Sequence, residues 1–418
     1  MNLLFVKETN ESSKFESGHF QSFIMRAFIK AIFTLFILLP VLATAANKPP
    51  KVNAGSNKIV VYPSSTSTSL SGSGSDAEGA VTFLWKQISG VSTAAIAKPT
   101  AAITTVSKLK PGIYTFRLTV TDNSGVSRSD TTSVSVLQKL TWTIGGVARE
   151  ALVHPPVGST GTAAPVIFAF HGHGGTDAEY AVKGFELNWP EAIVVYPQGL
   201  RTKGAILDLN CRQSGWQTTV GEVNCFNGIK DQDLKFFDTM LTTLRRKYNA
   251  NISLVFAHGW SNGAAFIYNV LWPARSKKLA GLGPSGGDLD TIAGKKPIPV
   301  IHAAGTQDVT DTFSHQQQDV QAIRNLNQCS SKGTVWATGP GGLLGTHYNS
   351  PINDPVVFLQ YNGGHPFPST VPPLMVQFFK EVAESKTIAP LITSVSPRAN
   401  NNLSAKSVVL INSPRLTH

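Results

Sequence analysis

The chain has 418 residues, of which 42% are hydrophobic and 15% charged, with 36 Gly and 25 Pro. This composition excludes coiled-coil and disordered proteins, and the length predicts two domains with processing segments. The formal net charge of +11 fits attraction to anionic envelopes or acidic polysaccharides, and a solvated basic surface explains it equally well. Because no run of Lys and Arg with interleaved aromatic residues accompanies this charge, nucleic-acid binding is not expected.

A long apolar stretch, residues 27–46, follows Arg26 near the N-terminus and ends in small residues. It predicts a signal peptide over residues 25–45, cleaved near Ala43-Thr44-Ala45, and a secreted protein, extracellular or periplasmic. A membrane anchor is the alternative, but Pro40 interrupts the stretch, so no stable membrane span is expected after cleavage. Residues 1–24 are polar and are predicted to be a non-native upstream extension, with translation starting at Met25.

Residues 48–137 alternate in short β-type runs separated by turn residues, which predicts a β-sandwich. The runs 81–87 and 114–121 show this alternation most clearly. Together with Asn53-Ala54-Gly55 and residues 70–76, they make this segment resemble a PKD domain, an immunoglobulin-like sandwich. The resemblance implies a spacer or a module that binds a polysaccharide or polymer surface, with Trp85 in its core.

Residues 139–386 alternate between apolar runs and helical patterns, which predicts an α/β domain with a mostly parallel, doubly wound sheet. The predicted buried strands are residues 165–170, 192–196, 252–257 and 298–303. Between them, residues 231–248 carry one apolar stripe at helical spacing. The tail, residues 387–418, is predicted to be extended and resembles the opening of an IPT/TIG-like domain, whose truncation is left open.

The pentapeptide Gly259-Trp260-Ser261-Asn262-Gly263 lies between the predicted strand 252–257 and a predicted helix, 262–271, that Pro273 ends. A G-x-S-x-G sequence between a strand and a helix is typical of the nucleophile elbow of α/β-hydrolases, so Ser261 is the predicted nucleophile. The pattern alone is weak, since it occurs again in Gly283-Pro284-Ser285-Gly286-Gly287. Ser285 is predicted to be a strand-end loop residue, because no helix follows it.

An elbow serine needs a general base and an acid that orients the base, and in this fold they follow in the order Ser, Asp or Glu, His. Asp308 directly follows the predicted strand 298–303, and His365 follows the predicted strand 356–361, which predicts acid and base respectively. The weighed alternatives are Asp311 for the acid and His302, His315 or His347 for the base. Each of these suits a structural role better.

The Phe170-His171-Gly172-His173-Gly174-Gly175 segment follows a predicted strand where an HG-rich loop contributes one backbone N–H to an oxyanion hole, and Asn262 is expected to supply the second. A metal pair of His171 and His173 is the alternative, but carboxylate partners are lacking, so no metal and no other cofactor is expected.

Three cysteines in an exported chain allow one disulfide, and Cys211 with Cys225 is the predicted pair. Cys329 remains, and its redox state is left open.

With these residues assembled, the α/β segment resembles secreted hydrolases of the polyhydroxybutyrate depolymerase, feruloyl esterase and acetyl xylan esterase family. The resemblance also rests on Tyr196-Pro197-Gln198-Gly199, Gly215-Trp216, Gly305-Thr306-Gln307-Asp308 and Gly363-Gly364-His365. It implies Ser261 as nucleophile, Asp308 and His365 as its partners, and the amides of His173 and Asn262 as the oxyanion hole. It further implies substrate contacts by Trp216 and Trp260. Asp231 and Asp233, at the start of the helical stretch, are expected to be helix caps rather than substrate ligands.

The expected activity is hydrolysis of a carboxylic ester through an acyl-enzyme, with polyhydroxybutyrate-type or feruloylated or acetylated polysaccharide esters as candidate substrates. Two alternatives remain open. One is a surface-binding or adhesion protein without activity, and the other is a secreted serine peptidase of the same fold.

Overall fold

The computed structural model describes residues 46–158, 161–204 and 208–393. The predicted upstream extension and signal peptide lie outside the described residues, as does the tail beyond residue 393. The predicted tail does not begin as an extended segment, because helix α8, Val371–Thr393, continues past residue 387.

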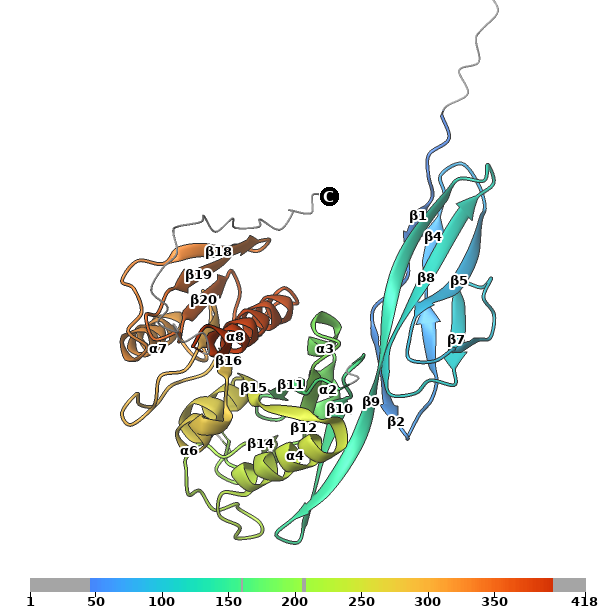
Figure 1. The fold of residues 1–418 in the computed structure, drawn as a ribbon. Helices are drawn as coiled ribbons and strands as arrows, with labels where there is room; N and C mark the ends of the chain where they lie inside the picture. The colour runs from blue at the N-terminus through green and yellow to red at the C-terminus, as the bar shows by residue number, and fades with distance from the viewer. Residues whose placement is uncertain (1–45, 159–160, 205–207, 394–418) are drawn as a thin grey trace, which may run out of the picture. The chain divides into compact units, whose positions relative to one another are not determined.

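The N-terminal part of the described chain is built from strands alone (Figure 1). These strands are β1 Lys51–Asn53, β2 Lys58–Tyr62, β3 Thr68–Ser71, β4 Ser73–Ser75, β5 Val81–Ser89, β6 Ala95–Ile96, β7 Ile103–Ser107, β8 Gly112–Asp122 and β9 Ser127–Ile144. In β8 every second residue from Gly112 to Asp122 is buried, so one face forms the core. Trp85 of β5 is 1% exposed and packs in that core, as expected.

Strand β9 is continuous across the predicted domain boundary at residues 137–139. Its first part pairs with β8 and β2, and its last part, from Gln138 to Ile144, pairs with β10, Val147–His154. No turn residue interrupts this stretch, so the strand does not break there.

The sheet of the C-terminal part runs in the order β18-β19-β20-β17-β16-β15-β11-β12-β10-β9. Its parallel strands are β11 Ala164–Phe170, β12 Ile193–Pro197, β15 Ala250–Trp260, β16 Gly281–Ser285, β17 Val300–Gly305 and β20 Val356–Tyr361. Two antiparallel strands join it at one edge, β18 Thr334–Gly339 and β19 Leu343–Tyr348. A separate two-stranded ladder is formed by β13 Leu200–Arg201 and β14 Ser214–Gly215. All four predicted strands are present, with β15 extended to residue 260.

Helices cover both faces of this sheet (Figure 1). One face packs against α4 Gln232–Tyr248, the helical segment beginning at α5 Asn262–Ala265, and α7 Phe313–Leu326. The other face packs against α2 Asp177–Ala181, α3 Phe185–Asn188 and α8. A mostly parallel sheet with helices on both faces and crossed strand order is the α/β-hydrolase fold, which confirms the predicted fold class.

The helix after the elbow is longer than predicted. It continues from α5 through a π-helical segment, η1 Phe266–Leu271, into α6 Trp272–Arg275, which contains Pro273. Pro273 has no backbone N–H to donate. Because the π-helical turn changes the hydrogen-bond spacing just before this residue, the helix continues through it.

Candidate functional site

Ser261 lies at a sharp turn between β15 and α5, with φ 56° and ψ −123°. This positive φ is strained for a residue with a side chain, and such strain is characteristic of nucleophile elbows. The turn at Ser261 is so tight that a Cβ on Gly259 or on Gly263 would collide with backbone atoms, which explains the two flanking glycines. The sequence therefore forms the predicted elbow at Ser261.

The second pentapeptide lies on the neighbouring strand, β16, where Trp260 is in register with Ser285. The N–H of Ser261 donates to the carbonyl of Ser285 at 2.9 Å. Ser285 is the last residue of β16 and is fully buried, so it is a strand residue rather than the loop residue expected. Its Oγ has no hydrogen-bond partner among the described residues.

His365 and Asp308, the base and acid expected from the sequence, lie in contact. Nδ1 of His365 lies 2.9 Å from Oδ2 of Asp308, whose side chain is fully buried. Oδ1 of the same carboxylate accepts from the N–H groups of Thr310 and Asp311 at 2.9 and 3.1 Å. These bonds fix the carboxylate, which in turn orients the imidazole.

Nε2 of His365 is buried and makes no hydrogen bond within the described part of the chain. Glycines let the surrounding loops approach. A Cβ on Gly286 would lie 3.2 Å from the His365 ring, one on Gly287 3.0 Å from the Ser261 carbonyl, and one on Gly172 3.3 Å from the Ser261 Cβ. Nε2 is therefore the ring nitrogen of His365 that is left free to accept a proton.

The rival histidines have other partners. His302 of β17 is fully buried between the Tyr268 hydroxyl, at 2.9 Å, and Gln316 Oε1, also at 2.9 Å. Burial lowers the pKa of His302 to about 4, so its ring stays neutral. His315 pairs with Asp288 at 3.1 Å, and His347 lies on β19.

His173 follows Gly172, which lies close to Ser261, and Asn262 directly follows Ser261 in the first turn of α5. Neither N–H donates to another described residue. The Asn262 side chain fixes the surroundings, since its Oδ1 accepts from Trp216 N at 2.7 Å and its Nδ2 donates to the carbonyls of Gly204 and Trp216. From the sequence, only the backbone amide of Asn262 was expected to have a role. The contacts of its side chain were missed, because they follow from its burial: Asn262 is 5% exposed, and a buried polar side chain needs hydrogen-bond partners.

The His173 ring is held by Asp208, with 3.0 Å between Nε2 and Oδ2. Asp208 also accepts from the N–H groups of Arg212 and Gln213, which lower its pKa. In the same loop region, Cys211 is bonded to Cys225 in the predicted disulfide. Cys329, elsewhere in the chain, is a free thiol, and burial raises its pKa. The His173 side chain therefore anchors the loop that carries Asp208 and Cys211.

Trp216 does not line a cleft, contrary to expectation. Its side chain is fully buried against Phe170 and Phe266, and its Nε1 donates to the His171 carbonyl at 2.9 Å. An indole is large enough to fill the space behind the oxyanion loop, which is the role it has here. Trp260 contacts His365, since its Nε1 donates to the His365 carbonyl at 3.1 Å.

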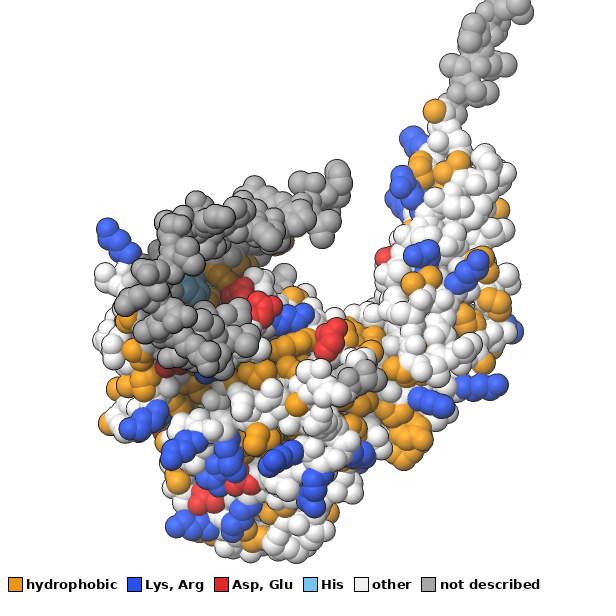
Figure 2. Space-filling view, viewed as in Figure 1, with side chains coloured by type: hydrophobic (Ala, Val, Ile, Leu, Met, Phe, Trp, Pro, Cys, Tyr) orange, Lys and Arg blue, Asp and Glu red, His pale blue; other side chains and the backbone are white. Residues whose placement is uncertain are grey.

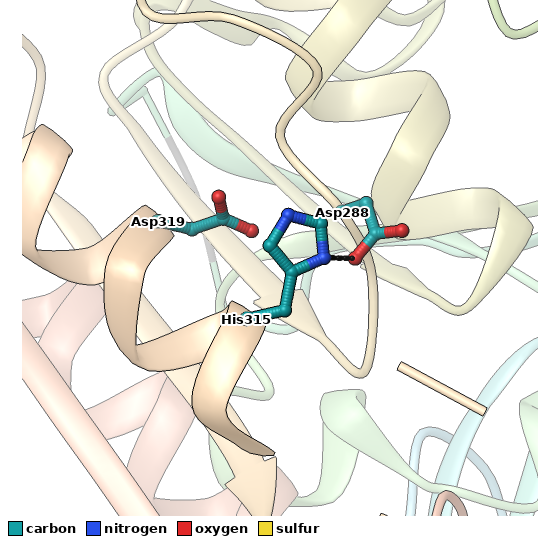
Figure 3. Close-up of side chains that lie close together, drawn as sticks. All are labelled: Asp288, His315 and Asp319. Atoms are coloured by element: carbon teal, nitrogen blue, oxygen red, sulfur yellow. Dashed lines mark ion pairs between the residues drawn. The ribbon is translucent and has the colours of Figure 1, made fainter. Parts of the chain in front are cut away.

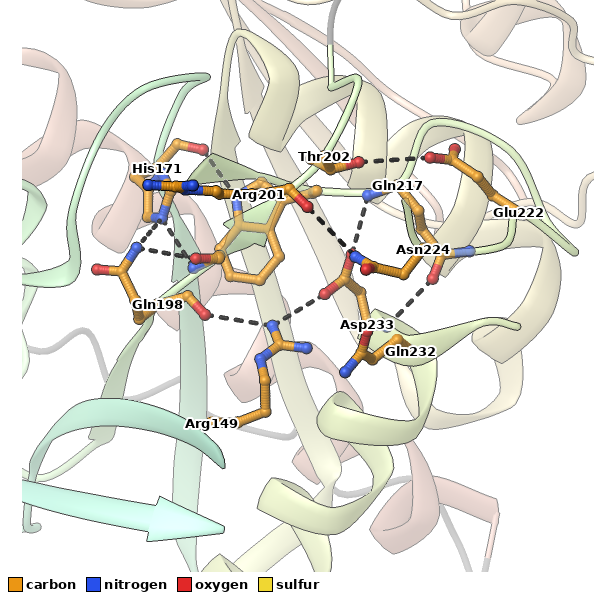
Figure 4. Close-up of polar contacts among 12 residues, drawn as sticks. Arg149, His171, Gln198, Arg201, Thr202, Gln217, Glu222, Asn224, Gln232 and Asp233 are labelled. Carbon is orange, nitrogen blue, oxygen red and sulfur yellow. Dashed lines mark hydrogen bonds and ion pairs between the residues drawn. The ribbon is translucent and has the colours of Figure 1, made fainter. Parts of the chain in front are cut away.

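Asp231 and Asp233 are structural, although neither caps α4 with its side chain. Asp231 adopts φ 54° and accepts from Gln217 Nε2 and Gly221 N. Asp233 accepts from Gln217 N and pairs with the buried Arg149 at 2.9 Å (Figure 4). Burial lowers the pKa of Arg149 and Asp233 opposes that shift, so the pair holds a charge inside the fold.

A pocket of about 780 Å³ opens at Ser261 and Asn262. It is further lined by Lys203, Gly204, Leu209, Thr218, Ala265, Asn269, Gly287, Asp288, Asp290, Thr310 and Asp311. Asp311 was weighed as a rival acid, and it lines this pocket. Burial first, and Asp288 next, raise the pKa of Asp311 to about 8.

Potential metal ligands lie close together behind this pocket. Asp288, His315 and Asp319 offer ligand atoms within 4.8 Å of one another (Figure 3). Burial raises the pKa of Asp319 to about 6. The expected absence of a metal is not tested by this arrangement and stays a prediction.

The basic residues show no single concentrated patch on the face seen in Figure 2, where Lys and Arg side chains are spread among polar and apolar ones. Among the described helices, none has the length and apolar character needed to cross a membrane.

Taken together, the fold and the site define an α/β-hydrolase domain that follows an immunoglobulin-like sandwich. The sandwich is a PKD domain, since residues 54–136 match a family model described as a PKD domain. The human dyslexia-associated protein KIAA0319 is 38% identical over 90 residues, which are 22% of this chain and 8% of that protein. This chain therefore spans less than a tenth of the length of the curated relatives it matches.

Solved esterase structures are similar to the chain at low identity. One is an acetyl xylan esterase from Aspergillus awamori, 15% identical with a TM-score of 0.42, covering 58% of this chain and 99% of that one. Another is a Bacillus cereus carboxylesterase, 16% identical with a TM-score of 0.37, covering 59% and 94%. The roles of individual residues rest on the site's own geometry.

Proposed function

We propose that this protein is a serine carboxylic ester hydrolase in which Ser261 is the nucleophile, His365 the base and Asp308 the acid that orients it. The observation that carries the proposal is the combination of a positive-φ serine at the strand-helix turn with a buried Asp308 bonded to His365 and a free Nε2 on that ring.

In the first step, Oγ of Ser261 attacks the ester carbonyl carbon while its proton passes to Nε2 of His365. The negative charge that develops on the carbonyl oxygen is stabilised by the N–H groups of His173 and Asn262. Collapse of this intermediate breaks the bond to the alcohol, which leaves with the proton from Nε2. Water then attacks the acyl-enzyme with His365 again as base, releasing the acid and restoring Ser261.

Asp308 keeps its negative charge next to Nδ1 throughout. It stabilises the imidazolium that forms in each step and holds the tautomer with the proton on Nδ1. The proposed substrates are polyhydroxybutyrate-type esters or feruloyl and acetyl esters of polysaccharides, with export by the signal peptide over residues 25–45. The PKD domain is proposed as the spacer or the module that contacts a polymer surface.

The two pentapeptides supply a matched test. Ser261→Ala is expected to reduce the hydrolysis of p-nitrophenyl acetate by about 10³-fold or more, while Ser285→Ala retains most of the activity. Circular dichroism and thermal unfolding of both variants check the fold. Loss of activity in Ser285→Ala with retention in Ser261→Ala would move the nucleophile to the second pentapeptide. Turnover of the matched p-nitroanilide at a rate comparable to that of the ester would favour a peptidase.

A further inference from the structure

One short segment of the chain, residues 208–216, bonds to both residues whose amides form the proposed oxyanion hole. We call this segment the brace. His173 comes from the loop after β11 and Asn262 from the first turn of α5, so the two residues belong to different elements. The distance between their amides therefore depends on what holds these elements together, and the brace is in contact with both.

The first part of the brace holds the His173 ring. Oδ2 of Asp208 lies 3.0 Å from Nε2 of His173, and the two side chains are 13% and 15% exposed. Asp208 is fixed in turn by three successive N–H groups, which donate to its carbonyl, Oδ1 and Oδ2 at 2.9, 3.0 and 2.9 Å and belong to Cys211, Arg212 and Gln213. Because an ionised carboxylate only accepts hydrogen bonds, Nε2 carries the proton in this contact. The ring is thus bonded to a carboxylate that has little freedom to move.

Ser214 of the brace holds the backbone that follows His173. The N–H of Gly174 donates to the Ser214 carbonyl at 2.7 Å, and Ser214 Oγ donates to the Gly175 carbonyl at 2.6 Å. Gly174 is the next residue after His173, so a displacement of the brace would also displace the His173 N–H.

Trp216, at the end of the brace, holds Asn262. Oδ1 of Asn262 accepts from the Trp216 N–H at 2.7 Å, and its Nδ2 donates to the Trp216 carbonyl at 3.1 Å. The His173 ring and the Asn262 side chain meet at Gly215, where a Cβ would lie 2.7 Å from both His173 Nδ1 and Asn262 Oδ1. Both residues therefore pack on the same stretch of backbone, while Asp208 holds the imidazole by its other nitrogen.

We infer that Asp208 is a positioning residue for the oxyanion hole: it holds the His173 ring against the brace and so keeps the two N–H groups at the spacing that the oxyanion needs. This inference rests on the proposed esterase function and adds a residue to that site. Loss of one oxyanion donor lowers kcat by about 10²- to 10³-fold, and a displaced donor loses part of that effect. Among the described residues, the pocket lining includes Leu209 and not Asp208, so substrate binding should depend little on this carboxylate.

A double-mutant cycle tests whether Asp208 acts through His173. Asp208→Ala is expected to lower kcat for p-nitrophenyl acetate by about tenfold or more and to change KM by less than about threefold. His173→Ala keeps the backbone N–H and removes only the ring, so a similar loss is expected. The double variant should lose no more than either single variant, because both substitutions remove the same contact.

Two further measurements separate positioning from a general loss of structure. His173→Gln is expected to have a kcat about fivefold or more above that of His173→Ala, because its amide N–H can reach Asp208, and this recovery should vanish when Asp208→Ala is added. The affinity for an alkyl trifluoromethyl ketone, whose adduct with Ser261 carries the oxyanion, should fall in Asp208→Ala by about the same factor as kcat/KM. Asn224→Ala is the control, since it removes a turn bond to Phe226 N in the same disulfide-bridged loop and should leave kcat and ketone affinity unchanged.

Unchanged kcat in Asp208→Ala and His173→Ala, or additive losses in the double variant, would overturn the inference. A fall in kcat without a fall in ketone affinity would overturn it as well. If circular dichroism shows that Asp208→Ala is unfolded, the two His173 variants decide, and equal kcat in His173→Ala and His173→Gln counts against the inference. In each of these cases, hydrolysis that is lost in Ser261→Ala leaves the esterase proposal standing. Hydrolysis that survives in Ser261→Ala would instead remove that proposal, and the inference with it.

Discussion

The two Gly-x-Ser-x-Gly pentapeptides lie on adjacent parallel strands, β15 and β16, yet their serines are in opposite situations. Ser261 turns out of its strand at φ 56° and begins helix α5, whereas Ser285 stays within its strand, 0% exposed and without a described partner for its Oγ. A helix follows the first serine and a Gly-Gly-Asp loop follows the second. What distinguishes the proposed nucleophile from Ser285 is therefore the backbone conformation at and after the serine, which the pentapeptide pattern does not encode.

The largest expected effect concerns the His365–Asp308 pair. Asp308→Asn is expected to lower kcat for p-nitrophenyl acetate by about 10³- to 10⁴-fold, because an amide at this position favours the wrong imidazole tautomer and no longer stabilises the imidazolium. Steady-state kinetics measures the loss. Asp311→Asn is the comparison variant, and an equal loss in both would make the choice of Asp308 as the acid wrong.

Backbone packing is the next difference. A Cβ at Gly259 would meet the backbone of Gly263 and Ala264, which cannot yield, whereas at Gly283 it would meet Met375 Sδ at 2.7 Å and Phe379 Cζ at 2.8 Å. Gly259→Ala is expected to lower the free energy of unfolding by about 3 kcal/mol or more, and Gly283→Ala by about 1 kcal/mol. Urea unfolding of both variants gives the two values. Similar losses would mean that the elbow is no tighter than the strand end.

His258 links the two strands, since its Nδ1 lies 2.6 Å from the Gly283 carbonyl and its Nε2 2.6 Å from the Tyr180 hydroxyl. Burial lowers the pKa of His258 to about 3, while in the unfolded chain the ring takes a proton near pH 6.5. Between these values the unfolded state binds more protons, so stability is lost as the pH falls.

This histidine is expected to contribute a slope of about 1.4 kcal/mol per pH unit between roughly pH 6 and 4. The buried His154, His171 and His302 act in the same direction, since burial lowers the pKa of each to about 4. His258→Phe should be less stable at pH 7 and show a shallower slope in urea unfolding from pH 7 to 4.5. His315→Gln is the control, and an unchanged slope in His258→Phe would refute this account of the ring.

Much of the fold could be predicted from the sequence, because parallel strands buried on both faces are apolar throughout and an amphipathic helix has a visible period. β11 and α4 follow these rules within a residue or two. The elbow was predictable because strand, small residues and helix follow one another along the chain. Asp308 and His365 were predictable because each follows a strand at the carboxyl edge of the sheet.

Other features depend on contacts distant in sequence. Pro273 ends no helix because a π-helical turn precedes it, and residues 387–393 are helical because α8 continues. Trp216 looked like a cleft residue from its motif, but whether an aromatic ring faces a cleft or fills space behind it is decided by Phe170 and Phe266. The pocket at Ser261 combines two separate loops, one after β16 and one after β17, so its lining could not be read from local sequence.

The most direct test of the central claim is covalent labelling of the intact protein with a fluorophosphonate, followed by peptide mass spectrometry. Fluorophosphonates react with serines activated by a neighbouring base, so the account predicts one adduct, on the peptide containing Ser261, which disappears in His365→Ala and persists in Ser285→Ala. An adduct on the peptide containing Ser285, or labelling of Ser261 that does not depend on His365, would contradict it.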